Sequence, residues 1–317
     1  MKKLLIMLLT GILIGGNIYM LPKVYDAWQI HMRVSEQQQI SEKVLYPMVR
    51  IQIQFTEGQS RGSGVVVFSE LVNGVYNTYI ITCAHLFGMG KSIVYDNIKE
   101  TRIKIFSEEK EWHDLNAVII AADVAKDVAL LKVETTDKYA TATFAAPDIF
   151  DTMYTLEKVY HIGTMFGREI HPIESHLAQR PHEGYGRTQG PIYPGYSGGP
   201  CYLAKDLTLI GLNQRIGVYQ VSPVSSINVP TIAGFIGIDL IKAWLDEIGH
   251  GFVYNKVLNA AALDTIALDS KKLAVAPKLK VEESAVKVDE ETAEEATPEE
   301  EEAMEKAFEK AFGIHEE

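Results

Sequence analysis

The stretch of sequence that decides the fold of this chain is Gly195-Tyr196-Ser197-Gly198-Gly199-Pro200. A serine set between glycines is typical of a nucleophile. The tight turn presents its hydroxyl group and leaves nearby backbone N–H groups free to bind an oxyanion. The stretch alone does not distinguish between the folds that use such a serine.

The order of candidate catalytic residues along the chain separates these folds. An α/β-hydrolase also has a Gly-x-Ser-x-Gly turn, but its acid and its histidine follow the serine. The only histidines after Ser197 are His250, just past a predicted helix, and His315, in an acidic tail. Before Ser197, His85 ends a β-type apolar run and Asp127 opens another. The order His, Asp, Ser is that of a chymotrypsin-type triad.

Five segments give the chain a resemblance to the trypsin-like serine proteases, and most of all to the bacterial HtrA/Deg branch. In residues 162–167, Met165 stands where the family's Ile-Gly-x-Pro-Phe-Gly turn usually has proline. Together the segments extend through roughly residues 45–250, and it is their shared order that makes the resemblance specific. The segments are residues 61–67, 81–85, 127–131, 162–167 and 194–200.

The resemblance implies a catalytic role for each of these residue types. Ser197 is the nucleophile and His85 the base that takes its proton, since an imidazole can exchange protons near neutral pH. Asp127 orients the imidazole and stabilises its charged form. The backbone N–H groups of Gly195 and Ser197 form the oxyanion hole, in which the loss of one donor costs about 10²–10³ in rate.

The middle of the chain predicts an all-β fold. Short β-type runs separated by turn residues favour a barrel or a sandwich. The resemblance selects two six-stranded Greek-key β-barrels with the active site in the cleft between them. Apolar residues in residues 238–248 recur at helical spacing and predict a C-terminal helix that packs on the second barrel. The predicted strands are residues 49–55, 64–68, 79–82, 102–106, 117–121, 128–133, 158–162, 207–212 and 231–236.

The N-terminal end lies outside the predicted protease domain, residues 45–250. Residues 1–22 begin with Met and two lysines and continue with nineteen uncharged, mostly apolar residues. This pattern favours an uncleaved membrane anchor over a removed signal segment. Residues 23–44 predict a stalk. The lysines should stay in the cytoplasm, which places the protease domain in the periplasm or outside the cell, and a cleaved signal would give the same compartment.

Residues 251–317 predict a linker followed by a disordered, acidic low-complexity tail. Residues 281–317 hold fifteen Asp or Glu and three Lys, and this difference of −12 equals the net charge of the whole chain. A solvated tail is the main interpretation, with a docking peptide as the alternative. The 68 residues after Gly249 do not fit the PDZ domain that HtrA proteases usually carry, so none is expected.

Cysteine and histidine usage predicts no cofactor and no metal site. Cys83 and Cys201 flank the predicted active site, and we expect buried free thiols, with a disulfide as the alternative. The histidines of the segment 171–182 lack a recognisable ligand spacing and are expected to be solvated loop residues. No phosphate-binding loop or basic patch is found, so nucleotide and nucleic-acid functions are not expected.

The specificity pocket is placed by analogy with the family. It should lie beneath the segment before Ser197 and beside the strand after Gly211. No carboxylate falls in residues 189–193, which argues against cleavage after Lys or Arg and favours a small or medium apolar side chain. The residues predicted to bind substrate are Pro191, Ile192, Tyr193, Asn213 and Gln214.

The predicted function is that of a serine endopeptidase acting on exposed or unfolded polypeptides outside the cytoplasm. The alternative from another class is a catalytically silent trypsin-fold scaffold that binds a partner, because a fold does not guarantee its usual activity. An esterase is a third option, since the same triad would serve it. Beyond polypeptide substrates, the expected partner is a membrane, through residues 1–22. Homo-oligomer formation, common in the family, is left open.

Overall fold

The computed structural model of the chain describes residues 38–88, 97–106, 112–222 and 225–275. The predicted membrane anchor, most of the predicted stalk and the acidic tail lie outside these residues. Within them, no helix is long and apolar enough to cross a membrane.

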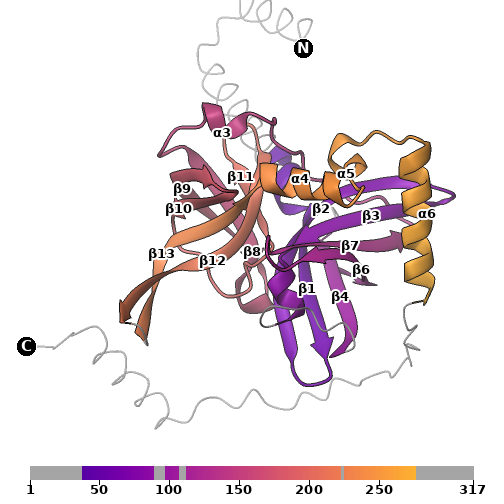
Figure 1. Cartoon of the computed structure of the whole chain (residues 1–317), viewed down its shortest axis with the longest axis horizontal. Coiled ribbons are helices and arrows are strands. Elements are labelled where there is room, and N and C mark those ends of the chain that lie inside the picture. The colour runs from indigo at the N-terminus through magenta and orange to yellow at the C-terminus, as the bar shows by residue number, and fades with distance from the viewer. Residues whose placement is uncertain (1–37, 89–96, 107–111, 223–224, 276–317) are drawn as a thin grey trace, which may run out of the picture. The chain divides into compact units, whose positions relative to one another are not determined.

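The first half of the fold is a seven-stranded antiparallel sheet in the order β5-β4-β1-β2-β3-β7-β6 (Figure 1). Its two outermost strands, β5 and β6, are separated in the chain by Ala117 alone, whose N–H donates to the Thr101 carbonyl across 2.9 Å. β5 and β6 can therefore be regarded as one bent strand, in which β5 pairs with β4 and β6 pairs with β7. The sheet curls so that its two ends meet at this strand. The strands are β1 Met48–Phe55, β2 Gln59–Val72, β3 Val75–Thr82, β4 Ile98–Phe106, β5 Trp112–Asn116, β6 Val118–Asp123 and β7 Val128–Thr135.

The second half is a closed barrel in the order β10-β13-β12-β11-β8-β9. The predicted all-β, two-barrel fold is thus confirmed, with the sixth strand of the first barrel broken into β5 and β6. The strands of the second barrel are β8 Lys158–Thr164, β9 Ile170–His182, β10 Tyr185–Gln189, β11 Pro200–Leu203, β12 Thr208–Ser222 and β13 Ser225–Gly237.

The long strand β9 is absent from the sequence-based prediction. Only Ser175 and Leu177 are buried among its thirteen residues, so the apolar alternation that marks a strand is missing. The histidines of residues 171–182, expected in a solvated loop, therefore lie on a barrel strand.

Short helices complete the two barrels. Helix α4, Ile238–Glu247, buries its apolar stripe against β12 and β13, which confirms the predicted C-terminal helix. Helix α5, Phe252–Asn255, packs on β2 and sets the ring of Phe252 5.3 Å from that of Phe68. Helix α3, Ile149–Thr152, precedes β8. Single helical turns are η1 Ser41–Leu45, η2 Ala84–Phe87 and η4 Met165–Gly167.

Helix α6, Ala260–Val275, stands beside β6 and β7 of the first barrel (Figure 1). Polar contacts fix it there, because the buried Lys132 ammonium donates to the Ile266 carbonyl at 3.0 Å and to Ser270 Oγ at 2.7 Å. Tyr79 Oη donates to Oδ2 of Asp269, which precedes Ser270, at 2.9 Å. Residues 251–275, expected from the sequence to belong to a linker, are thus part of the packed fold.

Candidate active site

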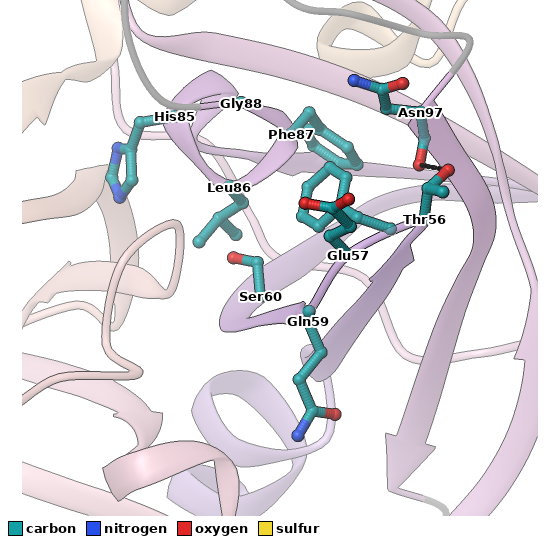
Figure 2. A pocket seen from close by; sticks show the side chains of 11 residues that line it. Thr56, Glu57, Gln59, Ser60, His85, Leu86, Phe87, Gly88 and Asn97 are labelled. Carbon is teal, nitrogen blue, oxygen red and sulfur yellow. Dashed lines mark hydrogen bonds between the residues drawn. The ribbon is translucent and has the colours of Figure 1, made fainter.

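His85 lies just after the end of the apolar strand β3 of the first barrel. After Thr82 the chain turns into η2, in which Leu86 and Phe87 are buried and hold the turn in place. Figure 2 shows the imidazole of His85 turned away from the ring of Phe87. The side chain is 43% exposed, so its ring faces solvent beside the barrel.

Asp127 occupies the turn between β6 and β7 and has a left-handed backbone (φ 57°), a conformation in which Asp is enriched. One carboxylate oxygen accepts the backbone N–H of His85 at 2.9 Å, and the two oxygens lie 3.0 and 2.9 Å from its Nδ1. Burial by itself would raise the pKa of this carboxyl group. The hydrogen bonds and the charge of His85 outweigh burial and hold the pKa of Asp127 below its ordinary value, so Asp127 is ionised.

Gln214 connects Asp127 to the serine. Its side-chain amide donates to Asp127 Oδ2 at 3.0 Å, and its backbone carbonyl accepts the hydroxyl of Ser197 at 3.3 Å. The predicted triad members are thus joined in one network, although the Ser197 hydroxyl is hydrogen-bonded to this carbonyl rather than to the imidazole. Attack on a substrate requires the hydroxyl to leave this acceptor and turn toward His85.

The backbone around Ser197 forms a tight turn with two unused donors. Tyr196 N–H donates to the Tyr193 carbonyl at 3.1 Å and Gly198 N–H to the Asn213 carbonyl at 2.8 Å. In the described part of the chain, the alternate N–H groups, of Gly195 and Ser197, have no protein acceptor. These are the two donors predicted for an oxyanion hole.

Glycine is required on both sides of this turn. Gly195 and Gly198 have φ values of +98° and +82°, which residues with a Cβ rarely adopt. A Cβ at Gly195 would come within 2.0 Å of the Thr164 carbonyl oxygen, and one at Gly198 within 2.1 Å of Thr82 Oγ1. The close approach of neighbouring strands, as well as the backbone conformation, thus selects glycine here.

Ser63, on β2 of the first barrel, ties this turn to both barrels. Its N–H donates to the Ser197 carbonyl at 2.9 Å and its Oγ to the Gly195 carbonyl at 2.7 Å. The same Oγ accepts the N–H of Thr164 on β8 at 2.9 Å. The segment 61–67 supported the family resemblance, but nothing in its local pattern assigned Ser63 a role at the site.

Tyr196 anchors the turn from beneath. Its ring is fully buried, and its hydroxyl donates to the His171 carbonyl at 2.5 Å and contacts His171 Nδ1 at 2.6 Å. Burial raises the pKa of Tyr196 far above its ordinary value, so the phenol stays neutral. The ring also explains Gly163, where a Cβ would come within 2.6 Å of it. His171 is therefore hydrogen-bonded to the turn that carries Ser197, a contact that the sequence did not predict.

The predicted pocket residues have different positions. Pro191 and Tyr193 are partly exposed before the turn, whereas Ile192 is 2% exposed and packs with Tyr196. Asn213, also predicted to bind substrate, has a fully buried side chain. The side-chain amide of Gln214, predicted to bind substrate, is hydrogen-bonded to Asp127.

Asn213 is buried because its amide joins three strands. Its Nδ2 donates to the Ile162 carbonyl at 3.0 Å and the Pro200 carbonyl at 3.3 Å, and its Oδ1 lies 2.5 Å from His161 Nδ1. His161 contacts Thr188 Oγ1 at 2.8 Å through its other nitrogen. Complete burial lowers the pKa of His161 to about 4, so this histidine is neutral at physiological pH.

Both cysteines are free and buried, as predicted. Cys83 lies next to the His–Asp pair and donates a weak hydrogen bond to the Asn213 carbonyl at 3.4 Å. Burial, helped by the negative charge of Asp127, raises the pKa of Cys83, so it is a neutral thiol. Burial likewise raises the pKa of Cys201.

An open groove of about 710 Å³ begins at His85 and extends along the first barrel (Figure 2). Its lining includes the rings of Phe55 and Phe87, and Glu57 contributes a carboxylate. The lining residues are Phe55, Thr56, Glu57, Gly58, Gln59, Ser60, His85, Leu86, Phe87, Gly88 and Asn97.

Comparison with known families agrees with this geometry. Residues 62–212 match the family model described as trypsin-like peptidase domain, and this range contains His85, Asp127 and Ser197. This part of the chain is a trypsin-like peptidase domain. The match supports a hydrolase of the protease class, and Gln214 lies just beyond its end.

Two solved structures similar to the chain are proteases. One is described as HtrA-type protease AlgWS227A with tripeptide, at 20% identity and a TM-score of 0.48, covering 67% of this chain and 63% of that one. The other is the serine endoprotease from Yersinia pestis, at 15% identity and a TM-score of 0.49, covering 67% of this chain and 65% of that one. The present chain thus spans less than two thirds of either protein. No curated protein matches it.

Proposed function

We propose that the chain is a serine endopeptidase that hydrolyses peptide bonds in exposed or unfolded polypeptides. The observation that carries the proposal is the network in which Gln214 joins the Asp127 carboxylate, paired with His85, to the hydroxyl of Ser197. The peptidase-family match, which contains His85, Asp127 and Ser197, supports the same conclusion.

In the proposed mechanism, Asp127 keeps the proton of His85 on Nδ1, so that Nε2 is free to accept. The Ser197 hydroxyl gives its proton to Nε2 as its oxygen attacks the substrate carbonyl. The N–H groups of Gly195 and Ser197 stabilise the oxyanion of the tetrahedral intermediate. The imidazolium then protonates the leaving amine, and a water molecule activated by the same base hydrolyses the acyl-enzyme.

The groove beside His85 supports a polypeptide substrate. It is an open groove, and its volume of about 710 Å³ lies within the size range of ligand-binding clefts. Glu57 in its lining adds a negative charge that would favour basic or neutral residues at that point of the substrate.

The test is labelling of the purified full chain with a fluorophosphonate, which reacts only with an activated serine. We expect labelling of the wild type and of Ser41→Ala, a remote control, and its loss in Ser197→Ala and in His85→Ala. Casein cleavage with the same dependence on Ser197 would establish an endopeptidase. Turnover of small esters without casein cleavage would point to an esterase, and an unlabelled wild type to a silent scaffold.

We also propose that residues 1–22 anchor the protein in a membrane with the protease domain outside the cytoplasm. The support is the pair of lysines followed by nineteen uncharged residues. Resistance of the full chain to extraction by carbonate, together with cleavage by protease added to intact spheroplasts, would be the expected result. Recovery of a shortened protein from the medium would instead mean a cleaved signal.

A further inference from the structure

Three kinds of metal ligand meet beside the candidate catalytic pair. One potential ligand atom from each of Cys83, His85 and Asp127 lies within 4.8 Å of the other two. No other three His, Cys, Asp or Glu side chains in the described part of the chain come this close together. The proposed hydrolysis uses the histidine and the aspartate but has no role for the thiol.

The backbone brings these side chains together. Cys83 and His85 are separated by one residue directly after β3, and Asp127, in the turn between β6 and β7, has a carboxylate oxygen within 4.8 Å of a ligand atom of each. Cys83 is completely buried, and its thiol donates a weak hydrogen bond to the Asn213 carbonyl and lies within hydrogen-bond reach of the Gly198 backbone. The imidazole is 43% exposed and can adjust its position toward an entering ion.

The ligand set selects a particular class of ion. Thiolate and imidazole prefer Zn²⁺ and similar soft or borderline ions over Mg²⁺ or Ca²⁺. A tetrahedral Zn²⁺ with bonds of about 2.0–2.3 Å holds its ligand atoms about 3.5 Å apart. The Nδ1–carboxylate distance of 2.9 Å and the outer limit of 4.8 Å bracket this spacing.

The charges also match. An ion that displaces the proton of the Cys83 thiol releases that proton to solvent, whereas the proton displaced from Nδ1 of His85 moves to Nε2, so the imidazole stays neutral. The thiolate and the carboxylate of Asp127 then carry two negative charges, which balance the two positive charges of the ion. No net charge remains in this partly buried site, which limits the cost of taking the ion out of water. A water molecule can take the fourth position.

We infer that Cys83, His85 and Asp127 form a binding site for Zn²⁺ and that the bound ion inhibits the enzyme. Coordination by Nδ1 removes the hydrogen bond to Asp127 that orients the imidazole, so the ion and the catalytic arrangement exclude each other. The inhibitory effect rests on the proposed hydrolase function, whereas binding of the ion does not.

The test measures binding on the full-length Ser197→Ala variant, which keeps the three ligands and does not depend on activity. Zn²⁺ binding is followed by calorimetry, and Co²⁺ binding by the absorption of the thiolate-to-cobalt charge transfer. Cys83→Ala removes the ligand. Cys201→Ala is the matched control, because this second thiol is equally buried and lies outside the cluster. The acidic residues 281–317 are present in every variant and give no thiolate band.

We expect one Zn²⁺ per chain, with the dissociation constant raised at least about tenfold by Cys83→Ala and unchanged by Cys201→Ala. The cobalt–thiolate band should disappear only in Cys83→Ala. Equal binding in both cysteine variants, or no binding below millimolar concentrations, would overturn the inference. With serine at position 197, Zn²⁺ should block fluorophosphonate labelling and a chelator should restore it. If metal binds as expected but the wild type is never labelled, the hydrolase proposal fails and the metal site stands.

Discussion

The side-chain amide of Gln214 donates a hydrogen bond of 3.0 Å to Oδ2 of Asp127, from a strand of the other barrel. The carboxylate is thereby held by groups from both halves of the fold, since His85 belongs to the first barrel. In the proposed mechanism Asp127 orients the imidazole only while it is itself fixed, which would make Gln214 a positioning residue.

Replacing Gln214 should therefore lower turnover more than substrate binding. For Gln214→Leu we expect kcat to fall by about tenfold with little change in KM, because the lost interaction acts through Asp127. Gln214→Glu should be worse, since a second carboxylate beside Asp127 repels it. Steady-state kinetics on a peptide substrate separates the two parameters. A rise in KM with unchanged kcat would instead assign Gln214 to the pocket, as the sequence predicted.

Glycine at position 198 should be indispensable. Gly198→Ala adds a Cβ that would lie 2.1 Å from Thr82 Oγ1, so we expect loss of fluorophosphonate labelling and a large fall in Tm. Gly74→Ala is the matched control, because Gly74 has a similar φ of +86° but open space around its Cβ position. That variant should lose only about 1 kcal/mol and remain fully labelled. Equal effects of the two substitutions would show that backbone strain, not the close approach of β3, determines the cost.

The hydroxyl of Tyr196 should stabilise both the fold and the turn formed by residues 195–198. Tyr196→Phe removes the contacts of this hydroxyl with the carbonyl and Nδ1 of His171, which should lower the free energy of unfolding by about 0.5–1.5 kcal/mol. The labelling rate should fall as well, because Tyr196 lies between the two N–H donors. Tyr193→Phe, a partly exposed neighbour, is the control for thermal unfolding and labelling. Unchanged labelling at reduced stability would limit Tyr196 to a structural role.

The chain order of the triad and the late helix α4 could be predicted from the sequence because they depend on local pattern. His85 ends an apolar strand, Asp127 opens one, and residues 238–248 show helical spacing. Other contacts at the site are hydrogen bonds between segments that are distant in the sequence, so no local pattern predicts them. These are the contacts of Gln214 and of Ser63, and the contact between Tyr196 and His171. Helix α6 was missed for the same physical reason, since its attachment depends on polar side chains rather than on an apolar stripe alone.

The attachment of α6 should depend on pH through Asp269. Burial alone would raise the pKa of this carboxyl group, but hydrogen bonds from His250 and Tyr79 outweigh it and lower the pKa of Asp269. A lowered pKa in the folded state stabilises the protein fully above the ordinary Asp value of about 4. This contribution is lost as the pH falls from that value through the folded-state pKa.

Asp269→Asn should therefore reduce the free energy of unfolding by about 1–3 kcal/mol near neutral pH. The difference in the free energy of unfolding between this variant and the wild type should become smaller as the pH falls below about 4. Asp264→Asn, on the exposed side of the same helix, should change little. Denaturant unfolding across this pH range tests the expectation, and a difference that stays constant down to pH 2 would contradict it.

Phe166, which is hydrogen-bonded to the segment just before Ser197, has both a strained backbone conformation and an exposed side chain. Its backbone is left-handed (φ 52°), its side chain is 55% exposed, and its N–H donates to the Pro194 carbonyl at 2.7 Å. An aromatic ring kept in such a position is expected to serve a ligand rather than the core. Phe166→Gly should therefore raise the free energy of unfolding by about 1 kcal/mol while raising KM for a polypeptide severalfold. Unfolding and kinetics measured on the same preparation test both effects. A more stable variant with unchanged KM would remove Phe166 from the substrate site.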